Sequence, residues 1–386
     1  MNFGYFCNTT NWDKKPYTQL LDEAREITEY CDQNNWNSIW YTEHHFNHEG
    51  MESCTNPLMM CTDAAARTKN IRLGQACNVI TFHNPIRLAE DIATLDQMSK
   101  GRVEVGIGRG VYGREAINMN KEADLKDQAK NFRLFSETLD IMKKAWSEDF
   151  FSHQGEFYTY PSPNFIWQHD MSPPKENVVD LKTNELKQIS VLPKPYQKPF
   201  PPISQVVDGE RSIQWAAENG LNTIMWIPTV KALKKRFEIY KDAKSKAVER
   251  FKILIKQKMY DGSAFYKVSE NTFVQAGDIE YGNINNLDYS KIGSGKSGLG
   301  LLKSELSNDF KFTEGSVGFA RATEFDTEDS EFFITLKEIP IYQGEYTPIG
   351  KVVYGLDILT KIKTGNKAIY VLRPDYIKTF RMFNSN

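Results

Sequence analysis

Short apolar runs alternate with longer amphipathic runs over the first 230 residues. The short runs predict buried β-strands, because brief continuous apolar stretches are typical of strands covered on both faces. The longer runs have helical spacing, as in Leu20, Ala24, Ile27 and Cys31. The predicted strands are 2–6, 38–41, 71–79, 103–107, 203–207 and 223–227, and the predicted helices are 17–34, 57–68, 85–99, 126–146 and 212–219.

This regular alternation predicts a parallel sheet covered by helices. Six β-α units can be counted, which falls short of a closed (β/α)8 barrel. Residues 150–202 interrupt the alternation with a long run rich in proline, aromatic and polar residues. We expect this segment to be functional, because long loops without secondary structure are uncommon in compact domains.

The pattern changes near Lys244. Beyond it, β-type runs at 273–275, 317–321, 332–336 and 349–353 are separated by glycine-rich turns, which predicts a mostly antiparallel β structure. Residues 230–257 contain no glycine or proline, so one continuous helix is expected across the junction. The sequence therefore predicts two domains, 1–243 and 244–386.

Composition and charge narrow the classes of function. The 386 residues are enough for two domains, and a net charge of -2 argues against a nucleic-acid binder. No apolar run could span a bilayer, and the N-terminus lacks the features of a signal peptide, so we expect a cytoplasmic protein without a membrane partner. The five cysteines form no zinc-type cluster, so no metal site is predicted.

Residues just after predicted strands are the candidates for chemistry, because the carboxyl ends of barrel strands face the active site. His44 follows the strand 38–41 and can exchange a proton near neutral pH. The alternative is that His44 and His45 only hydrogen-bond within a loop. Gly108 and Arg109 end a glycine-rich turn, where N–H groups and a guanidinium can hold an anion.

Two further candidates follow the last predicted strands of the first half. Arg211 and Ser212 lie where a helix begins, so they could bind a phosphate, although an ordinary helix cap explains them equally well. Trp226 ends the following strand and could pack on a flat ring. A core tryptophan is the better interpretation of Trp226 from spacing alone.

Residues 1 to about 243 resemble the luciferase-like, flavin-dependent monooxygenase family. The matching motifs are 2–6, 41–46, 72–74, 83–85, 88–90, 95–110, 193–202 and 215–220. The resemblance implies an incomplete TIM-type barrel that uses O2 and reduced FMN, supplied by a flavin reductase, to oxidise a small organic substrate. It also implies a homodimer. Some members use F420 instead, but the turn at Arg109 favours FMN.

The same resemblance assigns roles to individual residues. His44 corresponds to the catalytic histidine of the family. Arg109, Arg211 and Ser212 correspond to its flavin-phosphate contacts, with Gly108 beside them, and Trp226 corresponds to its flavin-side aromatic residue.

Residues from 244 onward resemble cyclophilin-type peptidyl-prolyl isomerases. The matching motifs are 244–252, 259–262, 264–268, 273–278, 315–322, 330–334 and 350–355. The resemblance implies a truncated cyclophilin-like β-barrel, without its first two strands, that binds proline-containing peptides. Lys267 stands in place of the family's catalytic arginine and cannot reproduce its planar fork. Gln275, Phe319 and Phe332 remain as a proline pocket.

Three functions follow from these observations. The first is an FMN-dependent monooxygenase. The second is a peptidyl-prolyl isomerase or a module that binds proline peptides. The third is a fusion product with both activities impaired, because each segment is cut at the junction. An open six-stranded sheet leaves two edges unpaired, so we also expect marginal stability.

Overall fold

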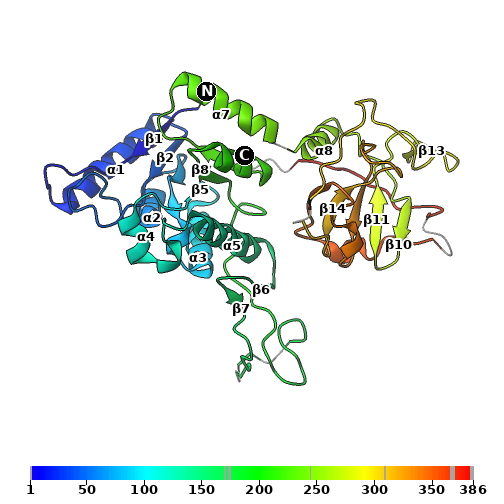
Figure 1. Ribbon diagram of the computed structural model, residues 1–386, viewed down its shortest axis with the longest axis horizontal. Helices are drawn as coiled ribbons and strands as arrows, with labels where there is room; N and C mark the ends of the chain where they lie inside the picture. Colours follow the sequence, from blue (N-terminus) through cyan, green and yellow to red (C-terminus); the bar gives the residue numbers. More distant parts are fainter. Residues whose placement is uncertain are drawn as a thin grey trace. The chain divides into compact units, whose positions relative to one another are not determined.

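The computed structural model describes residues 2–168, 171–172, 175–243, 245–307, 310–365 and 370–382 (Figure 1). The chain divides into two compact units, residues 1–243 and 244–386. Each unit contains a buried hydrophobic core of its own. Lys244, the predicted start of the second domain, lies outside the described residues.

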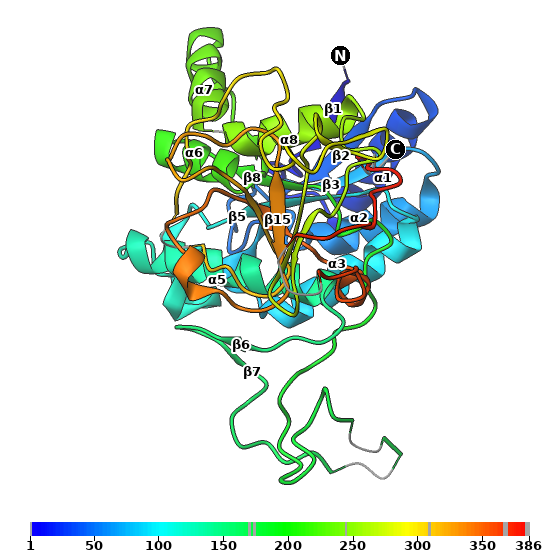
Figure 2. The same cartoon turned by 90° about the vertical axis from the view of Figure 1, so that its right-hand side faces the viewer.

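A parallel sheet forms the centre of the first unit (Figures 1 and 2). All of its neighbouring strands are parallel. The strand order is β1 (Gly4–Cys7), β2 (Ser38–Tyr41), β3 (Arg72–Gln75), β5 (Val103–Gly108), β8 (Ile203–Val206) and β9 (Asn222–Ile224), with β4 (Asn78–Val79) paired to β5. The predicted incomplete barrel of β-α units is confirmed.

Helices connect these strands and cover the sheet. They are α1 (Tyr17–Gln33), α2 (Pro57–Arg67), α3 (Pro85–Ser99), α5 (Gln128–Ser147), α6 (Glu210–Glu218) and α7 (Val230–Ala243), with a short α4 (Gly113–Met119) after β5. An Asn-Pro pair begins α2 and α3. The Asn56 side chain accepts from Met59 N at 2.9 Å and that of Asn84 from Ile86 N at 3.0 Å, while proline supplies the first helical residue.

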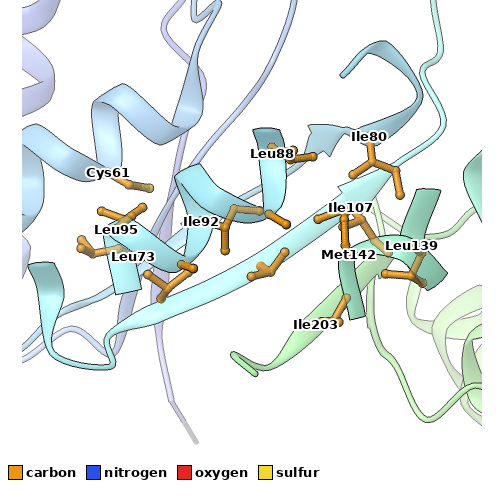
Figure 3. Close-up of a cluster of buried hydrophobic side chains, with 14 of the residues drawn as sticks. Cys61, Leu73, Ile80, Leu88, Ile92, Leu95, Ile107, Leu139, Met142 and Ile203 are labelled. Atoms are coloured by element: carbon orange, nitrogen blue, oxygen red, sulfur yellow. The ribbon is translucent and has the colours of Figure 1, made fainter. Parts of the chain in front are cut away.

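The core of the first unit lies between the sheet and helices α3 and α5. Figure 3 shows Leu88, Ile92 and Leu95 of α3 beside Leu73, Ile107 and Ile203 of the strands, with Leu139 and Met142 of α5 close to them. Each of these side chains is at most 5% exposed. Burial of each is worth about 1.5–3 kcal/mol, so this layer positions the strand ends that carry the site.

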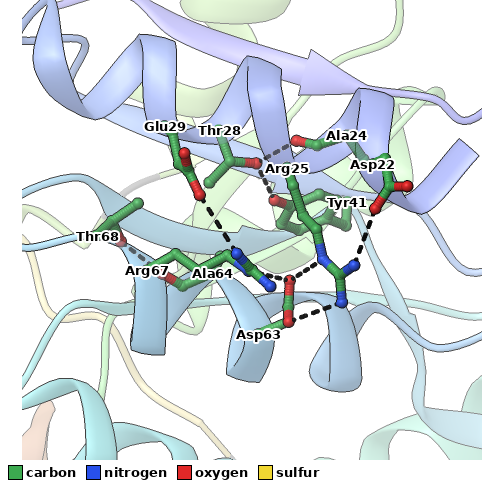
Figure 4. A network of polar contacts seen from close by, with 10 residues as sticks. All are labelled: Asp22, Ala24, Arg25, Thr28, Glu29, Tyr41, Asp63, Ala64, Arg67 and Thr68. Atoms are coloured by element: carbon green, nitrogen blue, oxygen red, sulfur yellow. Dashed lines mark hydrogen bonds and ion pairs between the residues drawn. The ribbon is translucent and has the colours of Figure 1, made fainter. Parts of the chain in front are cut away.

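Charged side chains join α1 to α2 outside this core (Figure 4). Arg25 donates to both oxygens of Asp63, at 2.9 and 3.1 Å, and Arg67 donates to the same carboxylate at 3.0 Å. Beneath them, Thr28 Oγ1 and the Tyr41 hydroxyl lie 2.6 Å apart, which ties α1 to the end of β2. This contact fixes the strand end from which the His44 segment departs.

The segment 150–202 leaves the body of the first unit and carries the hairpin β6 (His153–Gln154) and β7 (Thr159–Tyr160) (Figure 2). Residues 169–170 and 173–174 of this segment lie outside the described residues. Phe151 pairs with Ile189 in an antiparallel bridge, which joins the beginning of the segment to a later part of it. None of the described residues of the segment lines the cavity described below.

The predicted continuous helix over 230–257 is wrong. Helix α7 ends at Ala243, and a second helix, α8 (Lys246–Lys256), begins after Ser245. Ser245 Oγ accepts from Val248 N at 3.0 Å, and the Glu305 carboxylate accepts from Lys246 N at 2.7 Å and from Ser245 Oγ at 2.5 Å. The Ser245 cap and the distant Glu305 carboxylate stabilise a new helix start. Together they outweigh the helix propensity of residues 230–257, which favours one continuous helix.

An antiparallel sheet forms the second unit. Its order is β10 (Lys267–Ser269), β11 (Phe273–Ala276), β15 (Phe332–Thr335), β14 (Ser316–Phe319) and β16 (Pro348–Lys351). The unit also contains a hairpin of β12 (Gly282–Asn283) and β13 (Asn286–Leu287) and a short α9 (Leu356–Leu359). The predicted mostly β fold of the second segment is confirmed.

We predict that Glu305→Ala lowers the free energy of unfolding of the second unit by about 1–2 kcal/mol, because the start of α8 loses an anionic cap. Urea unfolding of the full chain measures this change. Glu314→Ala removes an exposed carboxylate of the same unit and serves as the control. Equal effects of the two substitutions would show that Glu305 does not stabilise the helix.

Candidate active site

A cavity of about 470 Å³ lies at the carboxyl ends of the parallel strands. Its lining residues lie in or after β1, β2, β3, β5, β8 and β9, so the whole sheet contributes to it. The predicted residues that line it are His44, Gly108, Arg109, Arg211, Ser212 and Trp226. The prediction that His44, Arg109 and Arg211 share one rim of the sheet is therefore confirmed.

One end of the cavity is positively charged. Burial lowers the pKa of the Arg109 guanidinium, and the nearby charge of Arg211 lowers it further, so the two cations lie close enough to repel each other. Gly209 precedes α6, and no side chain caps this helix start. Ser212 Oγ donates to Gly209 O at 2.8 Å. Two guanidiniums beside an uncapped helix start form a site for an anion such as phosphate.

Small and aromatic residues shape the wall between the two ends. Gly108 leaves room for Cys77, because a Cβ at position 108 would collide with the Cys77 sulfur. Trp226 is 54% exposed, so the interpretation of this residue as a core tryptophan is wrong. Its ring meets that of Phe6 at 5.1 Å, edge to face. Phe6 lies in the first strand and Trp226 follows the last, so the sheet curls until its two ends meet at the cavity.

The other end of the cavity contains His44 between two carboxylates. His44 Nε2 lies 3.3 Å from Glu52 Oε1, and His44 Nδ1 lies 3.4 Å from Glu115 Oε1. The Tyr112 ring lies 5.5 Å from the imidazole. The His44 side chain is 15% exposed, and it is part of the cavity lining. This arrangement places a proton-exchanging group at the wall of the cavity.

Glu43 holds this end in place from below. Its carboxylate accepts from His83 Nε2 at 2.8 Å and from Val79 N at 2.6 Å, and His45 Nε2 lies at 3.1 Å. Burial alone would raise the pKa of Glu43, but the two histidines and the Val79 amide lower it below the usual range. Glu43 raises the pKa of His83 against the opposing effect of burial.

The sequence did not identify Glu52, Tyr112 and Glu115 as site residues. Glu52 lies in the loop after β2, whereas Tyr112 and Glu115 lie at the start of α4, a helix that was not predicted. The available signal was their position after strands β2 and β5, which in a parallel barrel lie at the active face. Their charge and their contact with His44 depend on the tertiary fold.

The second unit has a smaller cavity of about 280 Å³, lined mainly by polar side chains. Lys267 and Gln275, both predicted for the peptide pocket, line it. The Gln275 amide donates to the Tyr266 hydroxyl at 2.6 Å and to Glu331 Oε2 at 2.9 Å, and the Tyr266 hydroxyl also donates to Glu331. Burial raises the pKa of Glu331, and Asp278 adds to the increase. The Gln275 amide thus donates its hydrogen bonds to other side chains of the same unit.

The assignment of Phe319 and Phe332 to this pocket is wrong. Both are at most 2% exposed, and both pack against Phe251 in the core, at 6.0 and 5.2 Å between ring centres. Gln275 pairs with Phe333 across β11 and β15, so Phe333 shares its face of the sheet and Phe332 points the other way. Strand alternation in the sequence was sufficient to make this correction.

Phe333 also does not reach the cavity. It packs against Phe312, Tyr342 and Tyr346, with ring centres 5.6, 5.2 and 5.1 Å away, and is 3% exposed. Arg321 covers Tyr346, at 5.0 Å from the ring centre. Aromatic side chains therefore fill the apolar space beside the polar cavity.

The fold of the first unit is a parallel β/α half-barrel. A cavity at the carboxyl edge of its sheet, lined by two arginines and a histidine, is typical of an enzyme of the barrel class. The luciferase-like monooxygenase profile matches residues 1–260, and the cyclophilin-type peptidyl-prolyl cis-trans isomerase profile matches residues 231–381. The chain belongs to the luciferase-like monooxygenase family and carries a cyclophilin-type domain after the barrel.

Known proteins resemble each unit separately. The oxygenase component of flavin-dependent trigonelline monooxygenase from Acinetobacter baylyi is 30% identical over 210 residues, which is 54% of this chain and 49% of that protein. A probable peptidyl-prolyl cis-trans isomerase from Brucella abortus is 37% identical over 132 residues, which is 34% of this chain and 67% of that protein. The chain therefore spans about half the length of its monooxygenase relative.

The crystal structure of monooxygenase RslO1 from Streptomyces bottropensis has a TM-score of 0.51 with this chain. It is 25% identical in sequence, and the match covers 63% of this chain and 65% of that structure. Within the described ranges, no helix is long and apolar enough to cross a membrane. No group of three or more histidine, cysteine, aspartate or glutamate side chains there could hold a metal ion.

We predict that Glu43→Gln lowers the stability of the first unit by about 1–3 kcal/mol near neutral pH, because two histidines and a buried amide lose a charged acceptor. The pH profile should change as well. The raised pKa of His83 contributes stability below pH 6.5, which is lost as the pH rises through the folded-state pKa, whereas the lowered pKa of Glu43 contributes stability that is lost in acid.

Urea unfolding at pH 5 to 9 tests this prediction. In Glu43→Gln, the decrease in stability above pH 6.5 should become shallower. An unchanged slope would show that the Glu43–His83 pair does not stabilise the fold. Glu90→Gln, at a partly exposed position of α3 and in contact with Arg87, serves as the control.

Proposed function

We propose that the first unit is the oxygenase component of an FMN-dependent monooxygenase, which uses reduced flavin and O2 to oxidise a small organic substrate. The observation that carries the proposal is one cavity with Arg109 and Arg211 at one end, His44 at the other and Trp226 in the wall between them. Membership of the luciferase-like family and the flavin dependence of the trigonelline enzyme support the cofactor class.

The residues of the cavity fit FMN. The Arg109–Arg211 pair and the uncapped start of α6 suit a phosphate, because guanidiniums and free helix N–H groups bind phosphate oxygens. Val79, Ile224 and Trp226 offer apolar surface for a flat ring system. F420 is the alternative cofactor, and a phosphate site of this kind does not by itself distinguish the two.

Reduced flavin supplies the electrons that activate O2 when it is bound. The chain contributes position and proton transfer. Arg109 and Arg211 would hold the phosphate end of the flavin, and His44 lines the same cavity. His44 then gives or takes a proton at the substrate, and Glu43 keeps the loop around it in one position. The trigonelline relative is named an oxygenase component, which supports a separate flavin reductase as the partner.

We predict that Arg211→Ala and Arg109→Ala each raise the Kd for FMN at least tenfold, because each removes charge-assisted hydrogen bonds to phosphate. Fluorescence titration with FMN and with F420 measures this Kd. Arg133→Ala, which removes an exposed arginine paired with Glu156, is the control and should leave FMN binding unchanged. Tighter binding of F420 than of FMN would contradict the proposed cofactor.

We predict that His44→Ala lowers flavin-dependent oxidation by about 100-fold or more while the Kd for FMN changes by less than about threefold. The reason is that His44 lies between Glu52 and Glu115, whereas Arg109 and Arg211 lie near each other. Single-turnover oxidation with chemically reduced FMN avoids any need for the reductase. An equal loss of FMN binding in His44→Ala and Arg211→Ala would reject this division of roles.

We infer that the second unit isomerises prolyl bonds weakly or not at all. Lys267 replaces the arginine fork, Gln275 is engaged with Tyr266 and Glu331, and aromatic side chains fill the space beside Phe333. Binding of proline-containing peptides at the polar cavity is the remaining alternative for this unit.

We predict that the full chain does not accelerate isomerisation of a proline-containing test peptide above the uncatalysed rate. Lys267→Arg should not restore activity, because the filled aromatic space and the Gln275–Glu331 hydrogen bond remain. A protease-coupled isomerisation assay, with an ordinary cyclophilin as the positive reference, measures this rate. A rate typical of cyclophilins would contradict the inference.

A further inference from the structure

The two ends of the first cavity differ in charge. Arg109 and Arg211 make one end positive, whereas Glu52 and Glu115 line the other end beside His44. Glu43 also lines the cavity, but His45 and His83 hydrogen-bond to its carboxylate. The negative end therefore has two carboxylates and one imidazole.

The carboxylates at this end have unused hydrogen-bonding capacity. Glu115 is 1% exposed, and its Oε1 accepts from His45 N at 2.7 Å. Among the described residues, Glu115 Oε2 and Glu52 Oε2 have no hydrogen-bond partner, although both are buried. Thr42 Oγ1, in the same cavity wall, is also buried without a partner. Buried carboxylate oxygens without donors are costly, so such atoms indicate where a ligand supplies the donors.

The negative potential reaches other groups in this part of the cavity. Burial raises the pKa of the Tyr112 hydroxyl, and Glu52 and Glu115 raise it further. Burial likewise raises the pKa of the Cys77 thiol, with additional contributions from Glu43 and Glu115. Both effects are those of a site that favours positive charge.

We propose that this end of the cavity binds a substrate that is a small organic cation, with its positive nitrogen against the free oxygens of Glu52 and Glu115 and beside the Tyr112 ring. Carboxylates neutralise the charge, and an aromatic face adds a cation–π attraction. Only the statement that the cation is a substrate rests on the proposed function. The binding of a cation at Glu52 and Glu115 does not depend on the flavin. It places the reacting carbon of the cation near His44.

The test compares two probes with the same number of heavy atoms. Benzylammonium is positively charged at pH 7, and benzyl alcohol is neutral. Calorimetric titration of the full chain, with and without FMN, should show benzylammonium binding at least tenfold more tightly than benzyl alcohol. Glu115→Gln and Glu52→Gln should each reduce the affinity for benzylammonium at least tenfold and leave benzyl alcohol within threefold.

The controls separate this inference from the proposed function. Glu115→Gln retains an acceptor for His45 N, and Glu52→Gln provides a second variant if the first does not fold. Glu49→Gln removes a carboxylate of the same loop that pairs with Arg114 outside the cavity, and it should bind both probes as the unmodified chain does. Equal affinities for the two probes, or no effect of either glutamine, overturn the inference. Loss of FMN binding with intact cation preference overturns the proposed function alone.

Discussion

The buried carboxylate of Glu43 joins three parts of the chain that make the histidine end of the site. It is bonded to the amide of Val79 on β4, to His83 before α3 and to its own neighbour His45. An unpaired carboxylate at this depth would be strongly destabilising, so these partners are held together. The next residue, His44, lines the cavity between Glu52 and Glu115.

The cavity exists because the incomplete sheet still curls. With six strands along its main path, the sheet cannot close by hydrogen bonds, yet Phe6 in the first strand meets Trp226 after the last. All strand ends therefore contribute to one cavity, with cations at one end and carboxylates at the other. Under the proposed function, this arrangement gives an anionic tail and a substrate different parts of the cavity.

The second unit has a cyclophilin-type fold, but the side chains on one face of its sheet differ from those expected for that family. Phe332 packs into the core with Phe251, as alternation on β15 requires, and this contact preserves the sheet. On the opposite face, Tyr266, Gln275 and Glu331 hydrogen-bond to one another. When the polar side chains of a face hydrogen-bond to one another, few of them remain available to act on a peptide. The core and the functional face of one sheet are thus separable, because alternate residues of each strand serve them.

The sequence by itself determined the order of the main strands and helices of the first unit and the positively charged residues of its cavity. Apolar runs fix the buried strands, and Asn84–Pro85 fixes where α3 begins, because these are local effects. Only the tertiary structure decided that the helix breaks at Ser245, since Glu305, sixty residues away, supplies part of the cap. Only the tertiary structure brought Glu52 and Glu115 to His44, because the charge and hydrogen bonding of a buried group depend on neighbours that the chain brings together when it folds.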